Sequence, residues 1–323
     1  MSPRPRHARK AQEQEHPRWN RLSDYFFSRF GAKVKKIPLD AGFSCPNRDG
    51  AISTQGCIFC NEQGSGTGLG LAGLSLAGQW QERTAPQLAK GFTLFMAYLQ
   101  SFSNTYGPIE KLTAVLEELK GLPGLVGLSV GTRPDCVDAG KLALIAGVCE
   151  EQAWPERWLE LGVQSSKDAT LKRINRGHGK AEAETAIALA QQAGLKVCVH
   201  LIAGLPGERK EDFLESVAWA SAQPVSGVKF HALYVCKGTA LAEMFHKGEY
   251  RPLTQEEYVE AVADALPLLR QDVVVQRISG DPAPGELLAP AWAERSRDTS
   301  NRILTELAKR NSCQGKDCLA RAR

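Results

Sequence analysis

Apolar segments alternate with helical patterns through the middle of this chain, and that alternation limits the fold more than any other feature. Six segments have the character of strands: residues 33–40, 92–102, 125–132, 157–165, 196–206 and 227–235. Helical patterns lie at 78–90, 108–122, 139–152, 181–194, 210–223 and within 254–270. Strands that alternate with helices build a parallel sheet with right-handed crossovers. We therefore predict an α/β fold, a partial (β/α)6 TIM-like barrel with an appended C-terminal helical segment.

Three regions follow from this pattern. Residues 1–22 are largely polar and we expect a disordered basic tail, residues 23–293 should form the barrel and its extension, and residues 294–323 a basic helical tail. The segment VVVQRISG, residues 273–280, is assigned to the extension rather than to the barrel. The hydrophobic fraction of 43% is ordinary for a globular chain and supports a sizeable core.

Targeting signals are not evident in the sequence. No apolar run reaches the roughly 18 residues that a membrane-spanning helix needs. The first twenty residues carry five Lys/Arg and no apolar core, which does not fit a secretory signal. We expect a cytoplasmic protein with reduced thiols and no membrane partner.

Positive charge gathers at the two ends of the chain, although the net charge is only +4. Residues 1–36 hold ten Lys/Arg against three acidic residues, and residues 294–323 hold eight against four. The middle of the chain is therefore acidic. Two interpretations stay open: the ends are solvated tails, or they are arms that contact phosphate groups.

Three cysteines lie within sixteen residues in CPNRDGAISTQGCIFC, residues 45–60. This loop follows the first predicted strand, so it should lie at the carboxyl edge of the barrel, where this architecture builds its active sites. In a reducing compartment, clustered cysteines indicate metal binding or catalysis more often than disulfides. We therefore expect Cys45, Cys57 and Cys60 to hold a metal centre.

The number of ligands separates three interpretations of this loop. Structural zinc takes four ligands, yet no histidine lies between His16 and His178 and the next cysteine is Cys136. A cubane iron–sulfur cluster held by three thiolates keeps one iron open for a substrate or cofactor. The cluster fits the sequence best, and zinc with a remote ligand and unliganded thiols remain as alternatives.

Polar residues recur at every second position of two predicted strands. In the fourth, Glu160, Gly162 and Gln164 share one face, while the apolar residues between them face the helices. Buried polar side chains are costly unless they are bound, so Glu160 and Gln164 either contact a ligand or form internal hydrogen bonds. In the sixth, Lys229 and His231 point inward by the same rule and are candidates for substrate contact.

Further motifs follow the later strands: GTRPDCV, LELGVQS, INRGH and HLIAGLPGE. Together with the cysteine loop they resemble the radical S-adenosylmethionine (SAM) superfamily, and within it the YhcC/YtqA-type proteins, over residues 23–293. The C-x11-C-x2-C spacing resembles the branch that contains the catalytic subunit of the elongator complex. The resemblance implies an enzyme whose [4Fe–4S] cluster, bound by the three cysteines, cleaves SAM reductively into methionine and a 5′-deoxyadenosyl radical.

The same resemblance implies contacts to SAM. Phe59 would lie near the adenine, and Ile202, Gly204 and Leu205 would form the adenine-binding strand. His200 stands where related enzymes often carry an acid that contacts the ribose. The implied contacts to the rest of SAM are Gln100, Ser101, Thr132, Glu160, Gln164 and Arg176. Gln100 and Ser101 replace a Gly-Gly-Glu pattern that is absent here, and Arg176 would grip the carboxylate with its planar guanidinium.

The motifs do not specify the substrate. One interpretation is tRNA, because the elongator branch modifies the wobble uridine; the other is a small metabolite. His178, Lys229 and His231 are the candidate substrate contacts, and flavodoxin or ferredoxin would supply the electron. A non-enzymatic barrel stabilised by zinc is kept as a different class of protein, and Cys313 and Cys318 either ligate a second metal or have no function.

Overall fold

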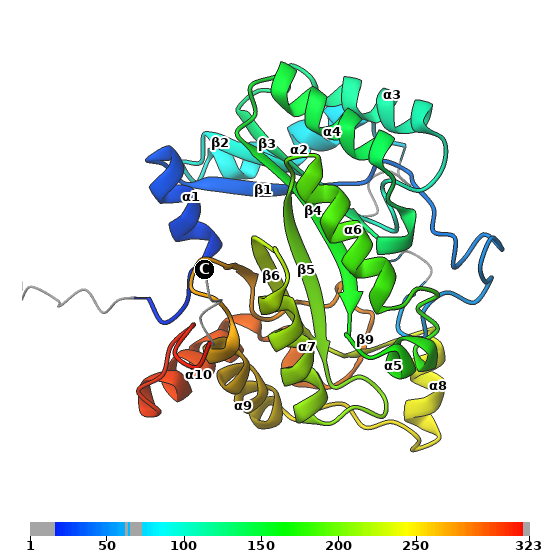
Figure 1. Cartoon of the computed structure of the whole chain (residues 1–323), viewed down its shortest axis with the longest axis vertical. Coiled ribbons are helices and arrows are strands. Elements are labelled where there is room, and N and C mark those ends of the chain that lie inside the picture. Colours follow the sequence, from blue (N-terminus) through cyan, green and yellow to red (C-terminus); the bar gives the residue numbers. More distant parts are fainter. Residues whose placement is uncertain (1–16, 62–63, 65–72, 319–323) are drawn as a thin grey trace, which may run out of the picture.

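One parallel sheet, curled into an open half-barrel, organises the chain (Figure 1). A computed structural model describes residues 17–61, 64 and 73–318. The strand order is β1-β2-β3-β4-β5-β6-β8, and all neighbours are parallel. The strands are β1 Val34–Leu39, β2 Leu94–Leu99, β3 Leu125–Thr132, β4 Glu156–Gln164, β5 Lys196–Ala203, β6 Gly227–Ala232 and β8 Val274–Arg277. A separate antiparallel pair consists of β7 Val235–Cys236 and β9 Leu287–Ala289.

Helices follow most of the strands and cover the outer face of the sheet (Figure 1). They are α1 Leu22–Phe30, α2 Leu76–Leu88, α3 Ile109–Leu119, α4 Ala139–Glu151, α5 Asp168–Arg173, α6 Lys180–Gln192, α7 Lys210–Ala222, α8 Ala240–His246, α9 Gln255–Ala265 and α10 Ser296–Lys309. Short 3-10 segments lie at Pro134–Cys136, Leu266–Leu268 and Ala291–Glu294. None of the helices in the described ranges has the length and apolar character that a bilayer crossing requires.

The predicted partial barrel is confirmed, and the two faces of β4 show why it forms. Leu159, Leu161 and Val163 are fully buried in the apolar layer between the sheet and its helices. Glu160 and Gln164 alternate with them and line a pocket on the inner face. The period-two pattern of the sequence therefore separates the core from the barrel interior.

The number of strands differs from the prediction. Residues 273–280 were expected to be an appended piece, but Val274–Arg277 form β8, a seventh strand that pairs in parallel with β6. The chain travels through α8 and α9 before it reaches β8, so the simple alternation of strand and helix is interrupted there. The three consecutive valines of this segment, Val273, Val274 and Val275, are all buried, as expected for a strand inside the sheet.

Helix α1 closes the amino-terminal end of the half-barrel. Phe26 is 1% exposed and packs with Met96, Trp158, Cys198 and Val274, inward residues from four strands. Residues at the start of β4 and β5 complete the contact, because the Tyr25 hydroxyl donates to the Glu156 carboxylate over 2.9 Å, and the Lys196 ammonium contacts the same carboxylate at 2.8 Å.

Removing the aromatic ring that α1 inserts should destabilise the protein strongly. We expect Phe26→Ala to lower the free energy of unfolding by about 3–5 kcal/mol, because the cavity opens among rigid strands. Phe27 is the matched control: it is the next residue on α1 but is 58% exposed, so Phe27→Ala should change stability by no more than about 0.5 kcal/mol. Chemical denaturation of both variants measures the difference, and equal losses would show that α1 does not plug the barrel.

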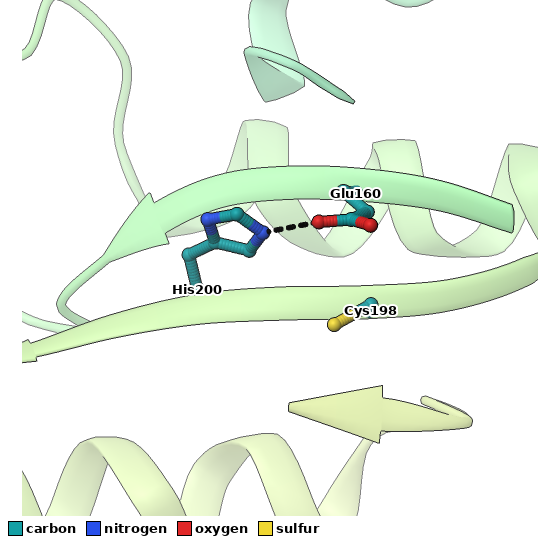
Figure 2. Close-up of side chains that lie close together, drawn as sticks. All are labelled: Glu160, Cys198 and His200. Carbon is teal, nitrogen blue, oxygen red and sulfur yellow. Dashed lines mark hydrogen bonds and ion pairs between the residues drawn. The ribbon is translucent and has the colours of Figure 1, made fainter. Parts of the chain in front are cut away.

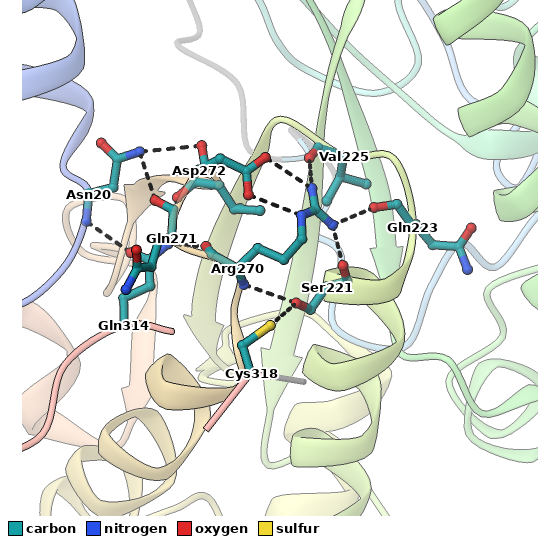
Figure 3. Close-up of polar contacts among 10 residues, drawn as sticks. Asn20, Ser221, Gln223, Val225, Arg270, Gln271, Asp272, Gln314 and Cys318 are labelled. Atoms are coloured by element: carbon teal, nitrogen blue, oxygen red, sulfur yellow. Dashed lines mark hydrogen bonds and ion pairs between the residues drawn. The ribbon is translucent and has the colours of Figure 1, made fainter. Parts of the chain in front are cut away.

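Both ends of the described chain are attached at this same amino-terminal edge. The Gln314 amide donates to Arg270 O over 2.6 Å and to Val273 O over 2.8 Å, and its oxygen accepts from Asn20 N at 2.9 Å (Figure 3). Arg270 in turn donates to the carbonyls of Gln223 and Val225, which precede β6. These bonds tie the entry of the chain to its C-terminal segment.

The inner parts of both predicted tails pack on the body of the protein. Trp19 is 7% exposed and Val275 N donates to Asn20 O, so residues 17–22 belong to the body of the protein. Helix α10 packs on α9 with Ile303 and Leu307 fully buried. The rest of the expected N-terminal tail, residues 1–16, and residues 319–323 lie outside the described residues.

Candidate cofactor-binding pocket

The three cysteines of residues 45–60 line one pocket at the carboxyl edge of the sheet. Their thiols are free; Cys45 and Cys57 are buried and Cys60 is partly exposed. Cys60 N donates to Cys57 O over 2.9 Å, which makes the tight turn of the C-x-x-C segment. Ile58 N donates to Ile174 O over 3.1 Å and fixes this turn on the segment that follows α5.

The Cys60 thiol is protonated when no metal is bound. Burial, reinforced by the neighbouring Cys57, raises the pKa of Cys60 to about 11. Thiolates are the metal-binding form, so loading a metal centre here must release protons.

Most of the predicted SAM contacts share the pocket with the cysteines. Its lining includes Phe59, Gln100, Ser101, Thr132, Glu160, Gln164 and Arg176. They come from the cysteine loop, from the ends of β2, β3 and β4 and from the segment after α5, so the topology gathers residues that are more than a hundred positions apart.

Backbone strain is concentrated in this lining. Ser101, Phe102 and Gln164 have φ of 96°, 56° and 75°, the left-handed region that residues with a Cβ rarely adopt. Such conformations cost about 1–3 kcal/mol each and persist where the surrounding structure holds them, often at ligand sites. The strain turns the chain sharply after β2 and at the end of β4, and this brings Ser101 and Gln164 to the pocket.

Ser101 and Arg133 are lining residues that keep a polar atom without a partner among the described residues. Ser101 Oγ and Arg133 Nη1 are buried and make no hydrogen bond within the described part of the chain. The rest of the Arg133 guanidinium pairs with Asp135, at 2.9 and 2.7 Å. Because unsatisfied buried donors are costly, the pocket fits a polar ligand that offers acceptors beside the thiols.

Thr132 is less available than predicted. Its hydroxyl lies 2.6 Å from Thr105 Oγ1, which also donates to Cys136 O over 2.6 Å. The hydroxyl is therefore engaged in a link between the loops that follow β2 and β3, although the residue lines the pocket.

Arg176 is buried beside the cysteines, with 8% exposure. Its Nη2 donates to Gly162 O over 2.6 Å, and its Nη1 lies 3.4 Å from Cys57 Sγ. Gly162 permits this approach, since a Cβ there would lie 2.6 Å from Nη2. Arg176 Nε also donates to His178 Nε2 over 3.0 Å.

His178 therefore supports Arg176, and it does not line the pocket. Burial, together with the charge of Arg176, lowers the pKa of His178 to about 3, so the ring is neutral. Its Nε2 accepts from Arg176, which leaves Nδ1 to donate toward Gly179 O at 3.3 Å. The predicted substrate contact at His178 gains no support from this placement.

Glu160 and His200 of the pocket lining belong to an ion cluster that five strands build. We call this set the interior ion cluster; it consists of Lys36, Ser129, Glu160, His200 and Lys229. The Glu160 carboxylate contacts the ammonium groups of Lys36 and Lys229, accepts from Ser129 and lies 2.8 Å from His200 Nε2. Of the two alternatives for Glu160, internal hydrogen bonding is therefore the one that the structure displays.

The charges of this cluster are mutually dependent. Burial alone would raise the pKa of Glu160, but Lys229 and Lys36 hold it well below its ordinary value. Burial lowers the pKa of Lys229 to about 7 against the attraction of Glu160. Burial and the charge of Lys229 lower the pKa of His200 to about 4, so this imidazole is neutral and donates to Glu160.

Glu160, Cys198 and His200 present ligand atoms within 4.8 Å of one another, a geometry that resembles a metal site (Figure 2). Two ammonium groups already contact the Glu160 carboxylate, and they would repel a dication. Burial also raises the pKa of Cys198, which opposes the thiolate form. We therefore assign these residues to the interior ion cluster and its surroundings rather than to a metal centre.

The predicted adenine strand lies beside the pocket rather than in its lining. Ile202 and Leu205 are buried in an apolar cluster that Phe59 joins from the cysteine loop. The carbonyl of Gly204, where φ is 84°, accepts from the Tyr250 hydroxyl over 2.9 Å. Lys229 and His231 are likewise absent from the lining, although His231 Nε2 is buried without a partner among the described residues.

Sequence reasoning missed several residues that the pocket uses. Arg48, Tyr98 and Phe102 line it, and the Arg48 guanidinium lies 5.5 Å from the centre of the Phe102 ring. Tyr98 faces the interior from β2, where the ammonium groups of Lys36 and Lys229 lie 4.5 and 4.3 Å from its ring centre. The sequence held a signal for Tyr98, because it is the single polar side chain of the strand segment LFMAYL and so could have been predicted to line a site.

Comparison with known proteins agrees with this arrangement. The family model of the Radical SAM superfamily matches residues 52–220, a span that includes Cys57 and Cys60 and begins after Cys45, and that of the Radical_SAM C-terminal domain matches residues 225–309. Protein YhcC of Escherichia coli K12 is 38% identical over 274 residues, which cover 82% of this chain and 84% of YhcC. The chain belongs to the radical SAM superfamily.

Two further similarities are to a tRNA uridine(34) acetyltransferase and to a solved archaeal Elp3. The tRNA uridine(34) acetyltransferase of Methanocaldococcus infernus is 32% identical over 160 residues, which cover 48% of this chain and 29% of that protein. Among solved structures, the archaeal Methanocaldococcus infernus Elp3 with an N-terminal deletion has a TM-score of 0.69 at 20% identity. That likeness covers 87% of this chain and 64% of the other and concerns the fold.

Family membership decides the class of protein and its cofactors. Radical SAM proteins are enzymes that use a [4Fe–4S] cluster and SAM and need a reductant, so the alternative of a non-enzymatic zinc module is set aside. The free thiols and unpaired polar atoms of the pocket fit these two groups.

Proposed function

We propose that the chain is a radical SAM enzyme that modifies tRNA at the wobble uridine. The observation that carries the enzymatic part is the single pocket that gathers Cys45, Cys57 and Cys60 with the candidate SAM residues. In this proposal the three thiolates hold the cluster, and flavodoxin or ferredoxin supplies the electron.

The residues of the pocket would divide the binding of SAM. Gln100, Ser101 and Gln164 would bind the polar groups, with Ser101 Oγ as an unpaired donor ready for an acceptor. Arg176 would contribute its guanidinium to the carboxylate, and Phe59 would pack on the adenine with Ile202, Gly204 and Leu205 behind it. Lys229 and His231 would then meet the substrate from the barrel interior.

What the protein does in the first step is positioning. When bound, the cluster supplies the electron that splits SAM and so yields a 5′-deoxyadenosyl radical. The strained backbone at Ser101, Phe102 and Gln164 fixes the donors before the ligand arrives, which lowers the entropy cost of alignment. Phe59 packs against the apolar cluster of Ile202 and Leu205, which would limit access of water to this end of the pocket. No side chain has to act as an acid or base in that step.

The tRNA substrate is supported by the partial similarity to a tRNA uridine(34) acetyltransferase and by the shape shared with Elp3. A comparison of modified nucleosides in tRNA from cells with and without the gene, prepared anaerobically, tests it directly. A modification that disappears with the gene and returns with the wild-type gene but not with a Cys57→Ala gene would support the proposal. An unchanged nucleoside profile would overturn the choice of tRNA.

A small-metabolite substrate is the second candidate, and the position of the charged ends favours it. Both ends of the described chain leave the amino-terminal edge of the barrel, opposite the cysteine loop (Figures 1 and 3). Arg302 pairs with Glu256 and Asp298, and Arg310 pairs with Asp264. These two C-terminal positive charges are therefore paired within the protein.

Deleting residues 1–16 separates these two substrates. The segment carries four Lys/Arg, so if it contacts phosphates its loss should weaken tRNA binding and reduce the slope of log K against log salt by about 3. Filter binding of tRNA across a salt series measures this. The deletion should stop before Trp19 because that side chain is buried; an unchanged melting temperature controls for folding, and an unchanged salt slope would show that the tail is only solvated.

A further inference from the structure

The sulfur atoms of the cysteine loop receive hydrogen bonds from outside the C-x-x-C turn. Asn47 Nδ2 lies 3.5 Å from Cys57 Sγ, and Arg176 Nη1 lies 3.4 Å from the same sulfur. Arg48 Nη1 lies 4.0 Å from Cys60 Sγ and also donates to Asn61 O. Cys57 is therefore approached by two donors, one neutral and one charged.

Both donors to Cys57 are held rigidly by other bonds. Asn47 is fully buried, and its Nδ2 also donates to Asn175 O over 2.5 Å. Arg176 is fixed by Gly162 O and by the neutral ring of His178. These hydrogen bonds hold the side chains of Asn47 and Arg176 in position without a ligand in the pocket.

The charge of Arg176 lacks a carboxylate partner within the described ranges of the chain. Every other contact of its guanidinium is to a carbonyl or an imidazole, while the comparable Arg133 nearby pairs with Asp135. A buried charge without a counter-ion is unfavourable. The group beside Arg176 that would ligate the proposed cluster is the Cys57 sulfur, 3.4 Å from Nη1.

We propose that Arg176 and Asn47 tune the reduction potential of the cluster through Cys57. Donors and positive charge beside a ligand sulfur stabilise the reduced, more negative cluster, and hydrogen bonds to the sulfurs are among the factors that set cluster potentials. Arg176 is thus a positioning and tuning residue for the metal centre. This inference rests on the proposed cluster site, and it adds a role to the SAM contact that the sequence motif implies.

The test is a potentiometric titration of the reconstituted protein, followed by the electron paramagnetic resonance signal of the reduced cluster in the absence of SAM. Arg176→Met should lower the midpoint potential so that the ratio of reduced to oxidised cluster at a fixed potential falls about tenfold, which is 59 mV for a one-electron couple. Asn47→Leu should shift it in the same direction by a smaller amount, since a neutral donor is lost. Omitting SAM separates this effect from a weaker SAM contact.

Arg173→Met is the matched control. It removes the same charge from the same segment, but Arg173 is exposed and lies against Gly207 rather than a sulfur, so its titration should match wild type. If Arg176→Met does not retain the cluster, Arg176→Gln, which loses the charge but keeps a donor, should still show a lowered potential.

The outcomes distinguish this inference from the proposed function. Wild-type protein that binds no iron and sulfide would overturn the proposed cluster itself. Wild-type and Arg176 variants that all bind a cluster with equal midpoint potentials would overturn the tuning role and leave the proposed function intact. A shift of the Arg173 control equal to that of Arg176 would show a general charge effect and equally reject the role of the Cys57 contacts.

Discussion

Replacement of any one of Cys45, Cys57 and Cys60 by alanine should abolish cluster binding and lower SAM cleavage by more than about 100-fold, since even the loss of a residue that only supports a metal ligand costs about 10–100-fold. The three thiols line one pocket. Each side chain starts from a different backbone position in the loop, so none can take the ligand position of another. Iron and sulfide content, together with 5′-deoxyadenosine formed under dithionite in the absence of oxygen, measures both effects.

Two other cysteines provide controls for this prediction. Cys149 is fully buried in α4, and Cys136 is buried at the carboxyl edge but outside the lining of the pocket. Cys149→Ala and Cys136→Ala should both retain iron, sulfide and SAM cleavage. Loss of the metal centre in Cys136→Ala would reveal a fourth protein ligand and would contradict a cluster with an open iron.

The fold was predictable where apolar runs and turn residues agree. Strands β1 to β6 all match segments that the sequence marks as strands, with β4 beginning one residue earlier than predicted, because both faces of a parallel strand are covered. Strand β8 was assigned wrongly, since only three residue pairs join it to β6 and two helices separate the two strands in the chain. Its place depends on pairing between distant segments, which local periodicity does not encode.

The sequence was sufficient to predict which loops come together at the candidate site. Parallel strands deliver their carboxyl ends to one edge, so the cysteine loop, Gln100 and Gln164 were expected together, and they line one pocket. The individual partners of each side chain were not predictable. Arg176 was assigned to a carboxylate of SAM, whereas the structure places its Nη1 beside Cys57 Sγ.

The interior ion cluster shows the physical reason for that limit. Period two predicted correctly that Glu160 points inward, but its partners come from β1, β3, β5 and β6. Lys36 was counted only among the basic residues of the N-terminal region, and no partner in the barrel interior was predicted for it. Only the curvature of the sheet brings Lys36 and Lys229 to the same carboxylate.

Removing the Glu160 carboxylate should be among the most destabilising single changes in the barrel. We expect Glu160→Gln to lower the free energy of unfolding by about 3–5 kcal/mol, because it leaves the buried ammonium groups of Lys36 and Lys229 without their counter-ion. Glu151→Gln is the control: this carboxylate pairs with Lys120 at 2.9 Å but its side chain is 57% exposed, so the loss should stay below about 1 kcal/mol. Urea denaturation measures both.

The dependence of this loss on pH identifies its cause. Burial lowers the pKa of folded Lys229 to about 7, whereas an unfolded lysine titrates near about 10.4. Below pH 7 the folded wild type keeps the Lys229 charge and its attraction to Glu160; as pH rises through 7 the proton leaves and that attraction is lost. The loss of unfolding free energy in Glu160→Gln should therefore be larger at pH 6 than at pH 9.

Adding Lys229→Met to Glu160→Gln should recover part of the stability at pH 6, because one unpaired charge is removed. A deficit that is independent of pH and simply additive in the double variant would show that packing around Glu160, rather than the Lys229–Glu160 pair, stabilises the interior of the barrel.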